Sequence, residues 1–233
     1  MTENESERRK IRSFVRRSGR IRGTCRDALT APPPNVLYNE ETLPAIGSRS
    51  LFGNGRPLII EIGFGMGDAT LAFAEANKDR NYLAFDVHRP GIGKVVSEIA
   101  VRQIPNLKIV EGDAQEILKS DKAETAVCDG FHIFFPDPWQ KKKHHKRRLI
   151  SPPFTEVLTS LLKPGGYLLV ATDWEDYADR IREVLSSFPE LENRSQPDFA
   201  RTPWRPETKF ENKGIEKGHR IFDFLYVKKE SIC

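Results

Sequence analysis

The sequence predicts an α/β fold with a mostly parallel sheet, and three features of the chain support this. Short apolar runs recur along residues 58–171, and their nearly continuous apolar character is typical of strands buried on both faces. Segments with helical spacing separate these runs, as the right-handed crossovers between parallel strands require. The last apolar run, at 222–227, alternates polar and apolar residues and is expected to form an antiparallel final strand.

The parallel strands are expected at five apolar runs. The runs cover residues 58–62, 82–85, 107–110, 125–128 and 167–171. The first run ends at a glycine cluster, and the fourth leads toward Phe134-Phe135-Pro136-Asp137. Acidic residues follow the other three. Because the carboxyl ends of parallel strands share one sheet edge, these flanking residues are expected to meet there.

The helices are expected between the strands, over residues 67–77, 91–103, 151–162 and 174–187. The third has apolar residues at helical spacing, at Phe154, Val157, Leu158, Leu161 and Leu162. It stops at Lys163-Pro164-Gly165-Gly166, a turn that leads from a helix into the next strand.

Residues 1–35 are predicted to form a flexible basic arm, and residues 36–233 a single domain. The arm is rich in arginine, has little apolar content and ends at Pro32-Pro33-Pro34, a run that stiffens the chain. Its excess of positive charge favours contact with RNA over a merely solubilising role. The whole chain carries a net charge of only +4, so the distribution of charge is more informative than its sum.

The chain is expected to be cytoplasmic. Its three cysteines, Cys25, Cys128 and Cys233, lie far apart, which is typical of reduced thiols. No apolar run approaches the length of a membrane span, and the charged N-terminus does not resemble a secretory signal. We expect no metal site, because the adjacent His144 and His145 lack cysteine or carboxylate partners at useful spacing.

A glycine-rich loop follows the first strand and has the sequence Glu61-Ile62-Gly63-Phe64-Gly65-Met66-Gly67. Glycines such as Gly63 and Gly65 permit a tight turn and close approach of a ligand to the backbone. Asp86 ends the next strand, where a carboxylate can accept hydrogen bonds from ribose hydroxyls. Asp113 follows the third strand, where it can meet an adenine amino group. The pattern predicts a pocket for a cofactor that contains adenosine.

Two such cofactors compete, a dinucleotide and S-adenosylmethionine. The dinucleotide fingerprint is G-x-G-x-x-G, whereas the glycines here fall at 63, 65 and 67. Glu61, just before the loop, would repel a pyrophosphate but can pair with the ammonium of a methionine moiety. A sulfonium cation also suits a pocket lined by acids, so S-adenosylmethionine is favoured.

The predicted catalytic loop is Phe134-Phe135-Pro136-Asp137-Pro138-Trp139. Prolines restrict the backbone around Asp137, whose carboxylate can accept hydrogen bonds from N1–H and the amino group of guanine. Methyl transfer to guanine N7 needs no general base, and Asp137 would stabilise the charge that the ring gains. The alternative is an exocyclic-amine methyltransferase, whose Asp-Pro-Pro-Tyr loop this segment partly resembles. Trp139 either stacks on a base or anchors the loop.

A basic run follows this loop, with six Lys or Arg and two His in eight residues. Its position beside the catalytic loop favours contact with RNA phosphates over a solvated face. The predicted RNA contacts are Lys142, Lys143, His144, His145, Lys146, Arg147 and Arg148.

Three motifs in order give the chain a close resemblance to the bacterial tRNA (guanine-N7-)-methyltransferases. They are Glu61-Ile62-Gly63-Phe64-Gly65, then Phe135-Pro136-Asp137-Pro138-Trp139 with the basic run, and Arg205-Pro206-Glu207-Thr208-Lys209-Phe210-Glu211. The resemblance implies a Rossmann-like class I methyltransferase fold, with a mostly parallel seven-stranded sheet and helices on both faces. It also implies that S-adenosyl-L-methionine methylates guanine N7 in the variable loop of tRNA, forming 7-methylguanosine.

The same resemblance implies roles for individual residues. The cofactor contacts would be Glu61, Asp86, Asp113 and Asp137, of which Asp137 would also be catalytic. The substrate contacts would be Lys141, Asp173, Thr208, Lys209, Phe210 and Glu211. Two positions depart from the usual pattern of the family, which often has glutamate where Asp86 stands and proline where Gln140 stands.

Two other classes of protein stay open from the residues alone. A methyltransferase of proteins or small molecules is disfavoured by the basic run. A non-enzymatic RNA-binding module is disfavoured by the acids at the strand ends, because acids repel phosphate. We expect tRNA as the partner, no obligatory protein partner, no membrane contact, and a monomer or homodimer.

Overall fold

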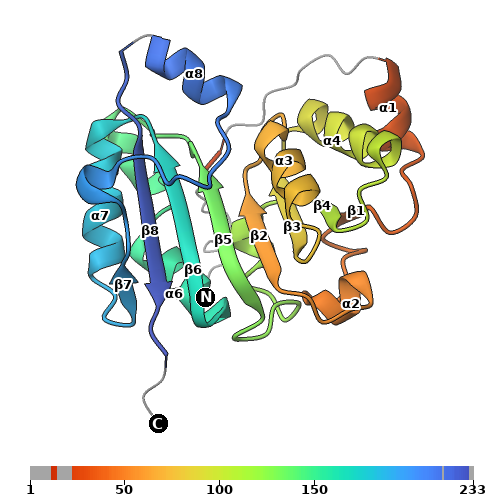
Figure 1. Cartoon of the computed structure of the whole chain (residues 1–233), viewed down its shortest axis with the longest axis horizontal. Coiled ribbons are helices and arrows are strands. Elements are labelled where there is room, and N and C mark those ends of the chain that lie inside the picture. The colour runs from red at the N-terminus through yellow and green to blue at the C-terminus, as the bar shows by residue number, and fades with distance from the viewer. Residues whose placement is uncertain (1–11, 15–22, 217, 231–233) are drawn as a thin grey trace, which may run out of the picture.

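The computed structural model describes residues 12–14, 23–216 and 218–230 of the chain. They form one eight-stranded sheet in the order β1-β4-β3-β2-β5-β6-β8-β7 (Figure 1). Strands β1 to β6 pair in parallel, whereas β8 runs antiparallel to both β6 and β7. The expected mostly parallel sheet and its antiparallel strand near the C-terminus are confirmed.

The strands lie close to the predicted runs. Their bounds are β1 Leu37–Asn39, β2 Leu58–Ile62, β3 Asn81–Asp86, β4 Leu107–Glu111, β5 Cys128–Phe134, β6 Leu162–Thr172, β7 Leu191–Asn193 and β8 Phe222–Lys228. Eight strands replace the expected seven, because the short strand β1 adds an edge beside β4. The strand order reverses between β2 and β5, and ligands bind outside the carboxyl ends of strands at such a point.

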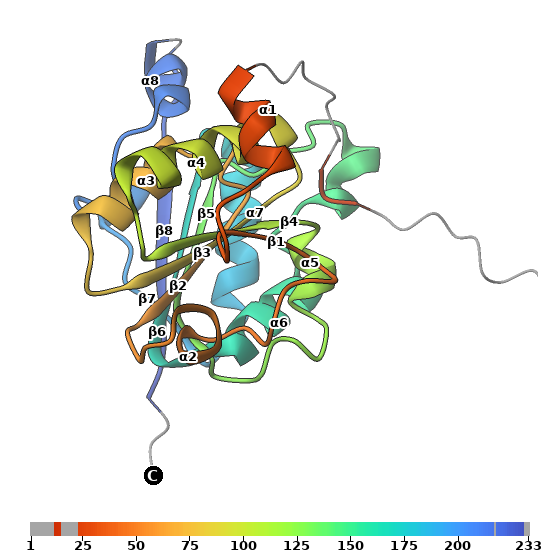
Figure 2. The ribbon, with the colours of Figure 1, turned by 90° about the vertical axis from the view of Figure 1, so that its right-hand side faces the viewer.

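Helices cover both faces of the sheet (Figure 2). On one face lie α3 (Asp68–Ala76) and α4 (Arg89–Arg102), with α1 (Gly23–Thr30) packed against α4. On the other face lie α5 (Ala114–Ile117), α6 (Pro152–Leu161) and α7 (Glu175–Ser186). The connections contain α2 (Ser48–Phe52), α8 (Lys209–Glu216) and two 3₁₀ helices, Lys142–Arg147 and Pro197–Phe199. No helix in the described ranges is long and apolar enough to span a bilayer.

Two apolar layers fill the space between the sheet and its helices. Ile59 and Ile60 are adjacent on β2, yet they belong to opposite layers because side chains alternate across a strand. Val95 of α4 packs in the layer of Ile59, and Phe154 of α6 packs in the layer of Ile60. All four side chains are fully or almost fully buried, as the nearly continuous apolar runs predict.

The prediction for the fourth strand was wrong in position. The apolar run at 125–128 only leads into the strand, and Ala126 within it has a left-handed backbone with φ 53°. The strand itself, β5, pairs with both β2 and β6 and carries two polar residues. Asp129 forms an ion pair with Lys163, at 2.9 Å, and His132 is buried against the hydroxyl of Tyr167. These partnered polar groups interrupt the apolar pattern of a central strand.

The packed domain begins earlier than residue 36. Ala28 and Leu29 of α1 contact the apolar layer beneath α4. Gly93 of α4 permits this approach, because a Cβ at that position would lie 2.4 Å from the carbonyl oxygen of Cys25. Residues 23–30, which belong to the predicted arm, thus form a helix that packs on the domain. Residues 1–11 and 15–22 of the predicted arm lie outside the described residues.

Candidate active site

A cavity of about 640 Å³ opens at the carboxyl ends of strands β2 to β5. The residues predicted to bind the cofactor all line it, namely Glu61, Gly63, Gly65, Asp86, Asp113 and Asp137. Thr208, from the segment that precedes α8, also lines the cavity. The folded chain thus brings together residues from position 61 to position 208, at the sheet edge where the acids are expected.

The glycine-rich loop between β2 and α3 forms part of the cavity wall. Gly63, Gly65 and Gly67 have φ values of 78°, 59° and 73°, a left-handed backbone that strains residues with a side chain. The loop is tied to β3, because Gly63 N donates to Phe85 O at 2.8 Å. A Cβ at Gly63 or Gly65 would meet no atom of the described residues within 4 Å. The bare backbone of this loop therefore allows close approach of a ligand.

Asp86 and Asp113 are held by backbone amides at the edge of the cavity. The carboxylate of Asp86 accepts hydrogen bonds from Gly65 N at 2.6 Å and from Val87 N and His88 N at 2.7 Å each. Asp113 caps α5 by accepting from Gln115 N at 3.0 Å. Burial raises the pKa of both carboxyls. Since a carboxylate offers about four lone-pair sites, both keep acceptor capacity for a ligand.

Glu61 is the most deeply buried acid of the cavity wall. Its side chain is 2% exposed, and its Oε2 atom has no hydrogen-bond partner among the described residues. Burial raises its pKa to about 8, so the carboxyl of the protein alone is mostly protonated at neutral pH. A buried acid with an unpaired oxygen beside bare glycine backbone fits a cationic ligand. S-Adenosylmethionine, with its ammonium and sulfonium groups, fits these residues.

Gly91 of α4 packs directly on the glycine-rich loop, although no sequence motif singled it out. A Cβ at Gly91 would lie 1.8 Å from the carbonyl oxygen of Gly65. We expect Gly91→Ala to displace the loop and to weaken cofactor binding about tenfold, because overpacking costs about 1–3 kcal/mol. Titration calorimetry measures the effect. Gly55→Ala is the control, since its Cβ would meet no atom within 4 Å in the part of the chain that the structure describes. Equal dissociation constants for the two variants would contradict the prediction.

The predicted catalytic loop has a constrained backbone. Asp137 is exposed in the cavity wall, between Pro136 and Pro138. On either side of this segment, Phe135 and Trp139 have left-handed φ values of 52° and 47°. Such conformations cost about 1–3 kcal/mol in non-glycine residues and cluster at functional sites. The surrounding structure therefore fixes where the carboxylate of Asp137 lies.

Trp139 anchors this loop to residues 12–14 of the N-terminal segment. Its Nε1 donates to the carbonyl oxygen of Ser13 at 2.9 Å, and the Arg147 guanidinium lies 3.7 Å from the centre of its ring. Arg147 also donates to the carbonyl oxygens of Arg12 and Phe14, at 2.8 and 3.2 Å. These contacts favour the anchoring role of Trp139 over stacking on a base. Ser13 and Phe14 also line the cavity.

The basic run divides into exposed and buried cations. Four lysines are exposed on or beside the 3₁₀ helix, Lys141, Lys142, Lys143 and Lys146. His144 and His145 are half-buried, and His145 lies 3.8 Å from Asp176. Arg148 is buried, forms an ion pair with Asp176 and donates to Pro138 O at 2.9 Å. Its placement does not fit the predicted phosphate contact, and it supports the catalytic loop instead.

The predicted substrate residues lie in two groups. Asp173 follows β6, and its Oδ2 lies 3.2 Å from Nδ1 of His219, a residue that the sequence did not single out. Thr208 reaches the cavity, but Glu211 is fully buried in an ion pair with Arg205. Lys209 and Phe210 begin α8, and their side chains lie outside the described part of the chain.

Three features define a class I methyltransferase that uses S-adenosylmethionine. They are the reversal of strand order at the glycine-rich loop, the acids at the strand ends and the antiparallel strand β8. Residues 55–224 match the family described as "Putative methyltransferase". The chain is 45% identical to the tRNA (guanine-N(7)-)-methyltransferase of Chromobacterium violaceum, over 97% of this chain and all of that protein. It is 44% identical to the enzyme of the same name from Dechloromonas aromatica, over 94% and 89% of the two chains. The chain belongs to the tRNA (guanine-N7-)-methyltransferase family.

Solved structures of RNA methyltransferases share the fold. The 16S rRNA methyltransferase KamB superposes with a TM-score of 0.55 and 16% identity, over 78% of this chain and 92% of KamB. An rRNA methylase from Streptococcus thermophilus gives a TM-score of 0.51 and 12% identity, over 82% and 92% of the chains. At such low identity the likeness concerns the fold alone, and it confirms the predicted Rossmann-like architecture.

Proposed function

We propose that this chain transfers a methyl group from S-adenosyl-L-methionine to N7 of a guanine in the variable loop of tRNA. The observation that carries the proposal is the position of Asp137. It lies in the wall of the acid-lined cavity, and exposed lysines follow it directly in the chain. The names of the two relatives support both the tRNA substrate and the N7 atom.

Each group of residues has one task in this reaction. The bound cofactor supplies the methyl group, and Glu61, Asp86 and Asp113 would hold it at the strand ends. Asp137 accepts hydrogen bonds from N1–H and the amino group of guanine and so orients the base. Since N7 carries no proton, no general base is needed there. As the methylated ring gains positive charge, the carboxylate of Asp137 stabilises it.

Product analysis tests the proposal. The purified chain is incubated with labelled S-adenosylmethionine and bulk tRNA, and the digested nucleosides are separated. We expect the label in 7-methylguanosine, and none in a tRNA whose variable-loop guanosine is replaced by adenosine. Label on an exocyclic amine would instead support the alternative suggested by the partial likeness to the Asp-Pro-Pro-Tyr loop.

Lys142 and Lys143 provide a test of the RNA surface. Both side chains are exposed at the start of the 3₁₀ helix, beside the catalytic loop. We expect the double variant Lys142→Gln/Lys143→Gln to bind tRNA more weakly. The slope of log K against log salt should flatten by about 0.7–0.9 for each phosphate that the variant no longer neutralises.

The salt dependence is measured by filter binding over a range of salt concentrations. Lys78→Gln is a matched control, because Lys78 is an exposed lysine just after α3, outside the basic run. An identical slope for the double variant and the control would mean that this part of the run is only solvated.

A further inference from the structure

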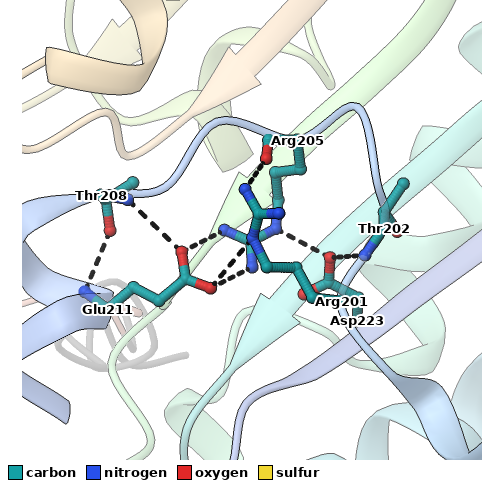
Figure 3. Close-up of polar contacts among 6 residues, drawn as sticks. All are labelled: Arg201, Thr202, Arg205, Thr208, Glu211 and Asp223. Carbon is teal, nitrogen blue, oxygen red and sulfur yellow. Dashed lines mark hydrogen bonds and ion pairs between the residues drawn. The ribbon is translucent and has the colours of Figure 1, made fainter. Parts of the chain in front are cut away.

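Arg205 is a fully buried arginine held between two buried carboxylates (Figure 3). Its Nη1 and Nη2 atoms donate to the two oxygens of Glu211, both at 2.7 Å, and its Nε donates to Asp223 at 2.8 Å. The side chains of all three residues are 0% exposed. A bidentate pair of this kind fixes both distance and orientation, which a lysine at the same position cannot do.

The two carboxylates connect Arg205 to two different structural elements, a strand and a helix. Asp223 lies on β8, in register with Ala171 of β6, and also accepts from Thr202 N at 2.8 Å. Glu211 lies in the first turn of α8. Arg205 therefore joins the start of α8 to strand β8, the next-to-last strand of the sheet.

Glu211 in turn fixes the position of Thr208. The amide of Glu211 donates to Thr208 Oγ1 at 3.0 Å, and the amide of Thr208 approaches Glu211 Oε2 at 3.4 Å. This reciprocal pair is a capping box, which specifies where α8 begins. Thr208 lines the cofactor cavity, whereas Glu211 behind it is sealed from solvent.

The guanidinium of Arg205 also faces the end of β5. It lies 5.7 Å from the ring centres of both Phe134 and Phe135, within the range of a cation–π contact. Phe134 and Phe135 line the same cavity and lead into the catalytic loop. One buried guanidinium thus contacts two segments that lead to the cavity wall, the one that carries Thr208 and the one that carries Asp137.

We propose that Arg205 is a positioning residue for methyl transfer, and that Glu211 acts on the substrate only through Arg205 and the cap of α8. The inference rests on the proposed function, since it concerns the site where the guanine is methylated. Both oxygens of Glu211 accept from Arg205, and Oε1 also lies 3.5 Å from Arg201. A side chain so enclosed does not contact the base. Thr208 is the residue of this motif that faces the cavity.

The variants Arg205→Lys, Glu211→Gln and Thr208→Ala test the proposal in the full-length chain. Arg205→Lys keeps the charge. Its single ammonium group, however, cannot replace the two hydrogen bonds to Glu211 and the one to Asp223 at the same time. We expect each variant to lower kcat about tenfold, because a small misplacement near the reacting atoms is costly. The KM for tRNA and the dissociation constant of S-adenosylmethionine should change by less than about twofold. Arg102→Lys, which alters surface pairs on α4, is the control and should leave kcat unchanged.

A double-mutant cycle separates positioning from direct contact. If Glu211 acts through Thr208, the double variant Glu211→Gln/Thr208→Ala has the same kcat as Thr208→Ala alone. Multiplying effects, or a raised KM for tRNA with kcat unchanged in Glu211→Gln, would overturn the proposal. Should Arg205→Lys fail to fold in thermal denaturation, the isosteric Glu211→Gln still decides the question. A wild-type chain that forms no 7-methylguanosine would reject the proposed function, and an active wild type with unaffected variants would reject this inference.

Discussion

Replacing Asp137 with alanine is expected to lower kcat by about 100-fold or more at saturating tRNA and cofactor. The carboxylate lies in the cavity wall, and the backbone around it is fixed by two prolines and by the left-handed Phe135 and Trp139. A group held in this way needs no reorganisation when the methylated guanine becomes positively charged. Its loss removes stabilisation from the transition state more than from the bound substrate, so kcat falls more than KM rises.

One further variant separates charge from size at this position, and a variant elsewhere serves as its control. Asp137→Asn keeps the size of the side chain but removes its charge, and we expect it to be almost as impaired as the alanine variant. Asp121→Ala removes an exposed acid in the connection after α5 and serves as the control. Single-turnover rates in rapid-quench experiments measure the chemical step. A rate for Asp137→Ala within about threefold of the wild type would exclude the catalytic role.

The strand-end acids could be predicted from sequence because the physics that places them is local. A short apolar run followed by Asp86 or Asp113 predicts a buried strand and a carboxylate at its end. In a parallel sheet all such ends meet at one edge, so the composition of the cavity follows from the order of elements. The glycine spacing, together with the acid that precedes it, then distinguishes the ligand. These predictions needed no knowledge of contacts between distant residues.

The remaining features depend on contacts that have no local pattern. β5 was misplaced because Asp129 and His132 are polar residues in a central strand, and each has a hydrogen-bond partner that is distant in sequence, Lys163 for Asp129 and the Tyr167 hydroxyl for Nε2 of His132. Residue types alone predict only a polar loop where α8 lies; the Thr208-x-x-Glu211 spacing was the available local signal, but the buried pairing of Arg205 with Glu211 and Asp223 has none. Gly91 resembles any helical glycine until the carbonyl oxygen of Gly65 is seen against it. Pairings of this kind become visible only in three dimensions.

Replacing Glu61 with glutamine is expected to weaken S-adenosylmethionine binding about 30-fold, the second largest effect. Removing one partner of a buried charge pair costs about 2 kcal/mol or more, and each 1.4 kcal/mol is a factor of about ten in affinity. The free protein keeps this acid buried with one oxygen unpaired among the described residues, so the cationic ligand provides its missing partner. Titration calorimetry on the wild type and on Glu61→Gln gives the ratio of dissociation constants.

The raised pKa of Glu61 adds a dependence on pH that the glutamine variant lacks. Burial raises the pKa from its ordinary value of 4.5 to about 8 in the folded protein. The carboxyl of Glu61 therefore loses its proton at a lower pH in the unfolded chain than in the folded protein. Its protonation contributes stability that is full below pH 4.5 and is lost as pH rises through 8. The melting temperature of the cofactor-free wild type should fall between pH 5 and about 8 relative to that of Glu61→Gln. A cationic ligand favours the ionised carboxylate, so the affinity of the wild type should rise over the upper part of the same interval. If the melting temperatures of the two proteins instead change with pH in the same way across this interval, Glu61 is already ionised and burial does not hold its proton.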